Sequence, residues 1–227
     1  MSPTGDDGAL QARGLWTASF AQIAVDCARY LHPMPAVVAA STVLRWITLF
    51  GTDAEVSRET SEARCREEMV HLVDRLENRG SHQARLVIEA ADAGVRSPYQ
   101  GYLLWLLQCM LQSNVGARVE LATQHEIKAF GRNYLAEFAI PSCGVVIELD
   151  VDNDGKLRGT EMIRRHRDMI NAGWRVICVG REHLRFPETL IGYLLIELRR
   201  CGVRALRPYG GLWRPVSDEI LRQASWE

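Results

Sequence analysis

Five carboxylate side chains fall within one short segment, VVIELDVDNDGKLRGTE, which runs from Val145 to Glu161. Its first part, VVIELD, is typical of a buried strand that ends in two carboxylates, Glu148 and Asp150. Side chains two positions apart on a strand point to the same face, so these two carboxylates are neighbours. Neighbouring carboxylates repel each other, and a bound divalent cation relieves the repulsion. The segment therefore suggests a metal site.

The same segment allows a second interpretation, because DVDNDGKLRGTE matches the twelve-residue calcium loop. In that match Asp150, Asp152 and Asp154 occupy positions one, three and five, and Glu161 occupies position twelve. An EF-hand also needs a helix before its loop, whereas GVVIEL is strand-like. Asp-Asn-Asp-Gly is equally typical of a solvent-exposed turn. Ca²⁺ bound at these four residues is therefore an alternative to a site for a smaller cation.

A third carboxylate, Glu137, lies in the preceding apolar stretch NYLAEFAIP. If this stretch pairs antiparallel with VVIELD through the turn PSCG, Glu137 comes near Glu148. Mg²⁺ prefers a few carboxylates together with waters, and it leaves positions for phosphate oxygens. We therefore expect Glu137, Glu148 and Asp150 to bind Mg²⁺ or Mn²⁺ that activates water against a phosphodiester.

Basic residues follow the acidic segment directly. Lys156 would orient the attacking water or contact the phosphate, as the fourth catalytic residue after the three carboxylates. Arg164, Arg165 and Arg167 could bind the DNA backbone. A solvated helix face is the simpler explanation of the run RRHR, but its place just after the acidic segment favours phosphate contact.

The elements that must position these residues can be predicted from periodicity. Residues 97–202 show the pattern of a helix, three strands, a helix, a strand and a helix, which predicts an α/β domain with a mixed sheet covered by helices. Residues 1–96 are predicted to form a helical region. Within it, SFAQIAVDCARYL has one apolar stripe, made of Phe20, Ile23, Ala24, Cys27 and Leu31. Residues 203–227 are predicted to be a tail that packs on the α/β domain.

Bulk composition limits the function classes. The chain has 227 residues with a net charge of −1, which argues against a protein that coats nucleic acid by bulk charge. MSPTGDDGAL has no apolar run typical of a signal peptide, and no uncharged apolar stretch approaches the ~20 residues of a membrane span. The six cysteines are scattered without a C-x-x-C pair, as expected for reduced thiols. We therefore expect a cytoplasmic protein with no membrane partner.

From about Leu15 to Gly202 the chain resembles an actinobacterial family related to very-short-patch-repair endonucleases, within the PD-(D/E)XK restriction-endonuclease-like superfamily. The order and spacing of several stretches carry the resemblance: TASFAQIAVDCARYL, ARLVIEAADAGVRSPYQGYLL, NYLAEFAIP, VVIELD and RRHRDMINAGWRVICVG. It implies an αβββαβ nuclease core and metal-dependent cleavage of DNA. It also implies metal ligands at Glu137 and Glu148, with Asp150 at the third motif position.

The chain departs from the family pattern at three positions. Glu137 stands where the family usually has Asp, Gln100 where it has Glu, and Val151 where it has Gly. These departures leave open a second hypothesis, that of a catalytically inactive nuclease-fold module that binds nucleic acid or a protein partner. For such a module the family implies a toxin–antitoxin or phage-defence setting. A homodimer is compatible with either hypothesis.

Overall fold

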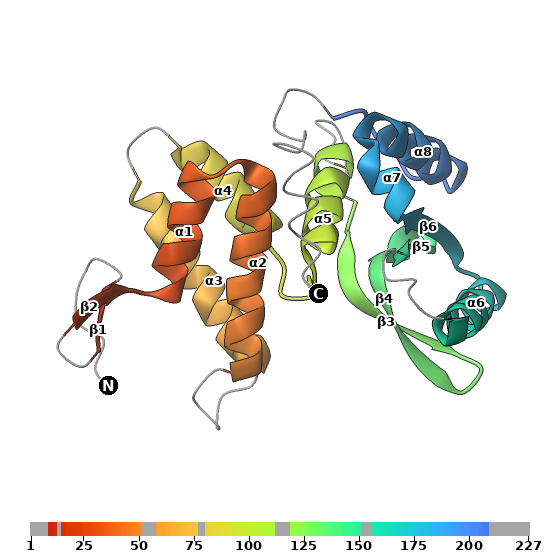
Figure 1. The fold of residues 1–227 in the computed structure, drawn as a ribbon, viewed down its shortest axis with the longest axis horizontal. Coiled ribbons are helices and arrows are strands. Elements are labelled where there is room, and N and C mark those ends of the chain that lie inside the picture. Colours follow the sequence, from red (N-terminus) through yellow and green to blue (C-terminus); the bar gives the residue numbers. More distant parts are fainter. Residues whose placement is uncertain are drawn as a thin grey trace. The chain divides into compact units, whose positions relative to one another are not determined.

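In the computed structural model of the chain, the described residues are 9–12, 15–50, 58–76, 80–111, 119–150 and 156–208. They form two compact units, Met1–Trp105 and Leu106–Glu227, and the division falls within helix α5 (Pro98–Leu111). Each unit is described by itself below, with the elements labelled as in Figure 1.

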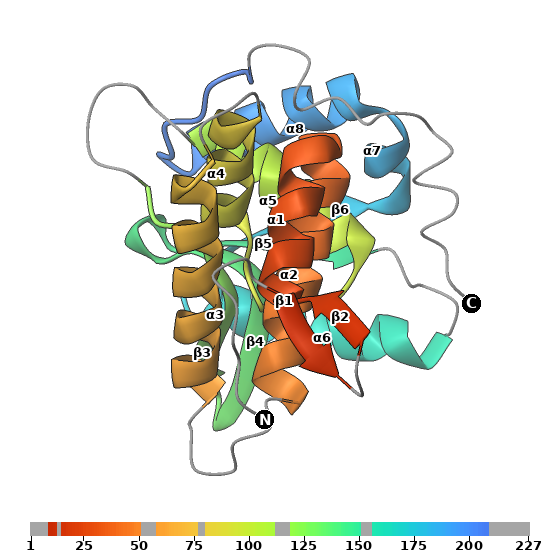
Figure 2. The same cartoon turned by 90° about the vertical axis from the view of Figure 1, so that its left-hand side faces the viewer.

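The N-terminal unit contains four helices that pack against one another: α1 (Phe20–Tyr30), α2 (Pro33–Phe50), α3 (Arg58–Asp74) and α4 (Ser81–Ala90). Their packing can be followed in Figure 2. Ahead of them, β1 (Ala9–Ala12) and β2 (Leu15–Ala18) form an antiparallel hairpin. The predicted helical character of this region agrees with the structure, but the hairpin was not predicted.

Helix α1 buries Ala24 but not the large residues of the stripe that its sequence suggested. Small residues carry its packing, since Ala21, Ala24, Val25 and Ala28 are buried. Three large residues of the predicted stripe, Phe20, Ile23 and Leu31, are exposed instead. The prediction that these large side chains face inward was therefore wrong, because close helix packing selected the face with the smaller residues.

Among the described helices, α2 alone has the length and hydropathy that crossing a membrane requires. Its 18 residues have a mean hydropathy of 1.3, and 39% of them are buried. The buried positions include Met34, Val37 and Leu44, and α2 packs against α1, α3 and α4. Such packing is typical of a core helix, which passes the same test of length and composition.

The C-terminal unit is built on a mixed four-stranded sheet in the order β3-β4-β5-β6. Its strands are β3 (Ala122–Ala129), β4 (Arg132–Ile140), β5 (Val145–Asp150) and β6 (Arg175–Gly180). Strand β4 pairs antiparallel with both β3 and β5, and β6 runs parallel to β5. The short 3-10 helix η1 (Pro141–Cys143) makes the β4–β5 turn, and α6 (Lys156–Asn171) makes the crossover to β6. The predicted mixed sheet flanked by helices is confirmed.

Helices cover both faces of this sheet. Figure 1 shows α6 on one side of β5 and β6, and α8 (Pro187–Arg200) on the other, after the short α7 (Arg181–Arg185). A hydrophobic cluster joins Met169 of α6 to the sheet residues Ile127, Ala129, Tyr134, Ala136, Ala139 and Val146. On the α8 side, the Tyr193 hydroxyl donates a hydrogen bond to the Cys178 carbonyl oxygen at 3.3 Å. The α6 face is the one on which the candidate site lies.

The chain after α8 packs back onto its own unit as far as it is described. Val203 and Ala205 are buried, and the Leu206 N–H donates to the Met110 carbonyl oxygen at 2.9 Å. Residues 209–227, the larger part of the predicted tail, lie outside the described residues.

Candidate functional site

The structure brings Glu137 and Glu148 together across β4 and β5. One oxygen of the Glu148 carboxylate accepts the Glu137 backbone N–H at 3.3 Å. In return, the Glu137 carboxylate accepts the backbone N–H of Leu149. Each carboxylate thus accepts a hydrogen bond from a backbone N–H of the neighbouring strand, at the point where the β4–β5 backbone pairing has ended. The meeting of these two residues was expected from the short turn PSCG.

At Glu137, the pairing of β4 with each of its two neighbouring strands, β5 and β3, is interrupted. On one side, the β4–β5 register ends at Phe138↔Ile147. On the other, the β3–β4 register passes from Thr123↔Phe138 to His125↔Ala136 and omits Gln124, whose φ is 48°. A positive φ at a residue other than glycine is uncommon and often marks a functional position.

The interruption also changes which side chains share a face. Ala136 and Ala139 belong to the same hydrophobic cluster although they are three residues apart. Regular alternation along a strand would place them on opposite faces, so the alternation shifts between these two positions. Glu137 lies at this shift. The local break in β4 is therefore what allows the Glu137 carboxylate to reach β5.

The Glu148 carboxylate also carries an ion pair with Arg165 of α6, in which a terminal nitrogen of Arg165 lies 3.0 Å from Glu148 Oε1. Glu148 is only 7% exposed. Burial of a charged carboxylate is unfavourable unless a counter-charge and hydrogen bonds accompany it. Arg165 and the Glu137 N–H supply both, so Glu148 is held as a neutralised, hydrogen-bonded group.

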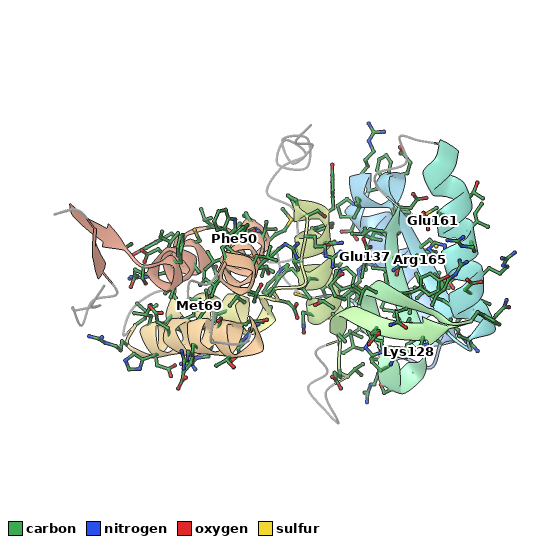
Figure 3. All side chains as sticks on the ribbon, turned by 90° about the horizontal axis from the view of Figure 1, so that it is seen from below. Phe50, Met69, Lys128, Glu137, Glu161 and Arg165 are labelled. Atoms are coloured by element: carbon green, nitrogen blue, oxygen red, sulfur yellow. The ribbon has the colours of Figure 1, made fainter. Side chains whose placement is uncertain are left out.

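Arg165 is itself held on several sides. The same terminal nitrogen donates to the Leu135 carbonyl oxygen, and the guanidinium lies 5.7 Å from the centre of the Tyr134 ring. The Tyr134 hydroxyl donates to Asp168 Oδ2 at 2.6 Å, and Asp168 is buried one helical turn after Arg165. Figure 3 labels Arg165 and Glu137 in this part of the C-terminal unit. Because its position is fixed by these contacts, Arg165 is not a freely mobile surface cation.

A histidine and a cysteine lie beside this ion pair. His166 Nδ1 is 3.6 Å from the Cys178 sulfur, and Cys178 pairs with Glu148 in the parallel β5–β6 register. Burial lowers the pKa of His166, and Arg165 lowers it further, while Glu148 and Asp150 oppose this. Burial raises the pKa of the Cys178 thiol, as do the charges of Glu148 and Asp150. The pair is therefore a neutral imidazole and a protonated thiol, not an activated nucleophile.

The carboxylates do not form a ready metal site in this arrangement. Hard oxygen ligands suit Mg²⁺ or Mn²⁺, and Glu137 and Glu148 supply them. However, no three acidic, histidine or cysteine side chains among the described residues are grouped so that they could hold a metal ion. Arg165 also already neutralises Glu148. The described residues therefore do not fit the expected Mg²⁺ or Mn²⁺ site unless Arg165 moves away.

The remaining predicted residues fall in three places. Asp150 ends β5, half-buried, near enough to His166 and Cys178 to affect their pKa values. Arg164 pairs with Glu161 at 2.9 Å, and the exposed Arg167 lies 3.9 Å from Asp168. Asp152, Asp154 and the Lys156 side chain lie outside the described residues.

The segment of the calcium-loop alternative follows a strand, as the strand-like GVVIEL predicted, and not the helix that precedes an EF-hand loop. A strand, β5, precedes the segment, and α6 begins at Lys156, the seventh of the twelve loop positions. Glu161, the twelfth, is already inside that helix and pairs with Arg164. Calcium binding there remains a prediction.

Three residues of the site were not singled out from the sequence as its members: Tyr134, Asp168 and Cys178. Asp168 carries a usable signal, because it follows Arg165 by three residues in a predicted helix and so shares a face with it. Cys178 and Tyr134 carry none, since they reach the site through strand register.

Comparison of the chain with models of known families, with curated proteins and with solved structures finds no match.

Proposed function

We propose that the chain is a nucleic-acid-binding protein with a restriction-endonuclease-like fold, in which Arg165 pairs with the carboxylate site and prevents it from binding a metal ion. The order of the elements and the contacts of Glu148 support this proposal.

The element order supports the fold part of the proposal. Helix α5 is followed by three antiparallel strands, the helix α6 and the parallel strand β6. This is the αβββαβ order implied by the family that the sequence resembles. Glu137 and Glu148 also lie on the second and third strands, where that family places its metal ligands.

The ion pair between Arg165 and Glu148 is the observation that carries the functional part. A carboxylate that a guanidinium neutralises at 3.0 Å, with 7% of the residue exposed, offers little to a cation from solvent. Arg164 and Arg167, on the same helix, can bind phosphates if their exposed ion pairs break, and such exposed pairs are weak. We therefore expect binding to nucleic acid without cleavage, in the cytoplasmic setting suggested by the sequence.

The test compares binding and cutting in one set of samples. The intact protein is titrated into fluorescein-labelled DNA in the presence of a chelator, and it is also incubated with supercoiled plasmid in Mg²⁺ or Mn²⁺. We expect a rise in anisotropy that weakens steeply with salt, and no nicking of the plasmid. The absence of DNA binding at low salt would contradict the proposal.

A second candidate function is a metal-dependent DNA endonuclease, and the meeting of Glu137 with Glu148 at the break in strand pairing favours it. For this function the Arg165 guanidinium must leave Glu148. Nicking by the wild-type protein that Glu148→Gln abolishes, with DNA binding retained, would establish this second candidate and contradict the first. Glu161→Gln is the matched control, because Glu161 is an exposed glutamate that pairs with Arg164 on the same helix.

A further inference from the structure

The turn that joins β3 to β4 consists of Phe130 and Gly131, with φ values of 50° and 74°. Two successive residues with positive φ are typical of a type I′ hairpin turn, for which Asn-Gly is the favoured sequence. A phenylalanine in the left-handed region is disfavoured, because its Cβ approaches the following carbonyl. Phe130 therefore occupies a position that turn stability alone would give to asparagine.

Packing does not explain this phenylalanine either. Phe130 is 68% exposed, whereas its neighbour Ala129 is buried in the cluster under α6. The residues around it on the hairpin, Lys128, Arg132 and Asn133, are all exposed and polar. An exposed aromatic ring among polar side chains is not part of an apolar patch of the kind that docks a protein partner.

The charges of the hairpin tip are not neutralised by the described part of the chain. The side chains of Lys128 and Arg132 make no ion pair or hydrogen bond with the described residues, and Lys128 can be located in Figure 3. By contrast, an acidic side chain pairs with six other arginines of the same unit: Arg164, Arg165, Arg167, Arg185, Arg200 and Arg207. The nearest acid on the hairpin is Glu126, two residues before Lys128. The tip thus carries an aromatic residue flanked in sequence by two cations, for which the described residues supply no acidic partner.

The hairpin tip extends away from the rest of the sheet but leads directly to the candidate site. Strand β4 pairs with β5 only from Phe138 onwards, so its first part has a strand neighbour on one side alone. Figure 1 shows this end of the β3–β4 hairpin beyond β5 and β6. From Arg132 to Glu137 the strand covers about 17 Å, roughly five base-pair steps of B-DNA.

We propose that Phe130 stacks on an unpaired base of a nucleic acid, while Lys128 and Arg132 bind the flanking phosphates. Aromatic stacking tolerates any base and needs an unstacked π-face, and phosphates supply the charge that matches the two cations. The inference rests on the proposed function, and it names the form of nucleic acid that the protein prefers: one with an unpaired base.

The experiment uses the full chain and three fluorescein-labelled DNAs: a single strand, a fully paired duplex, and the same duplex with one central unpaired base. The main variant is Phe130→Asn, since asparagine tolerates positive φ and should keep or raise the melting temperature. We expect it to weaken binding to the single strand and to the unpaired-base duplex about tenfold, with little change for the paired duplex. Phe130→Trp should retain the preference.

Two further measurements separate stacking from charge. Leu135→Asn changes an exposed apolar residue of the same hairpin and should leave all three affinities unchanged. Lys128→Ala with Arg132→Ala should weaken binding to every DNA and lower the salt dependence. If wild-type protein binds the DNAs but Phe130→Asn binds each as the wild type does, the inference fails and the proposed function stands. If wild-type protein binds none, the proposed function itself fails.

Discussion

Arg165 and Glu148 form an ion pair at 3.0 Å between the middle of α6 and the end of β5, and both side chains are largely buried. The pair joins the crossover helix to the sheet at the point where β4 and β5 stop pairing. It therefore has a structural role as well as a functional consequence. The helix is anchored there, and the carboxylate that the sequence marks as a metal ligand is neutralised.

Removal of either partner of this pair should destabilise the protein. Arg165→Met leaves Glu148 buried with only the Glu137 N–H, and we expect a loss of about 2–3 kcal/mol in the free energy of unfolding. Glu148→Gln combined with Arg165→Met should recover part of that loss, with a coupling energy of about 1–3 kcal/mol. Urea unfolding of the wild type, of both single variants and of the double variant measures this coupling energy.

The exposed pair Arg164–Glu161 is the matched control for that cycle, because it lies on the same helix at 2.9 Å. Its coupling should be about 0.5 kcal/mol or less. Equal coupling energies in the two cycles would mean that Arg165 does not anchor Glu148.

His166 should make folding stability depend on pH. Burial, the largest cause, lowers the pKa of its imidazole below the ordinary value of 6.5. The unfolded chain then binds a proton that the folded chain resists, so stability falls as the pH drops through 6.5 toward the lower pKa of the folded state. Well above 6.5 neither state binds this proton, so the contribution of His166 no longer changes with pH. Urea unfolding at about pH 5.5 and about pH 7.5 gives the change in the free energy of unfolding between the two pH values. We expect this change to be smaller for His166→Asn than for the wild type. An equal difference in both proteins would contradict the assignment.

The hydroxyl of Tyr134 should stabilise the C-terminal unit through Asp168. Tyr134→Phe removes the 2.6 Å hydrogen bond to the buried Asp168 carboxylate, and we expect it to lower stability by about 1–3 kcal/mol. Tyr30→Phe removes a hydroxyl from a tyrosine that is 68% exposed and should change stability very little. Thermal unfolding followed by circular dichroism distinguishes the two variants, and similar melting temperatures for both would refute this role of Tyr134.

Gly101 of α5 should resist replacement by alanine. A Cβ there would lie 2.5 Å from Val38 Cγ2 of α2, so Gly101→Ala should destabilise the N-terminal unit by about 1–3 kcal/mol. The additional change Val38→Ala should restore part of the loss, because it removes the clashing methyl group. Chemical unfolding provides the measurement.

Gly192 of α8 is the matched control for Gly101, since a Cβ added there meets no atom of the described residues within 4 Å, apart from its chain neighbours and its own helix backbone. Gly192→Ala should raise stability by about 0.5–1 kcal/mol through helix propensity. A loss of stability at Gly192 as large as that at Gly101 would show that helix backbone effects, not contact with Val38, govern both sites.

Local patterns in the sequence were enough to predict the elements of the C-terminal unit and the meeting of two carboxylates. Strand alternation and the short turn PSCG place Glu137 opposite Glu148, because pairing between adjacent strands is decided by turn length and by which face is buried. Helical periodicity failed for α1, where two apolar faces were available. Only contact with the other helices decided that the alanines, and not Phe20 or Ile23, are buried.

The tertiary structure alone decided what the carboxylates contact. The separation of Glu148 and Arg165 along the sequence does not determine where α6 docks on the sheet, since the crossover could place any face of the helix against β5. The same holds for Cys178, which reaches His166 through the parallel register of β6. The sequence thus determined which charged groups are present and on which elements they lie. Packing determined which of them neutralise one another, because ion pairs between distant segments depend on three-dimensional distance and not on separation along the chain.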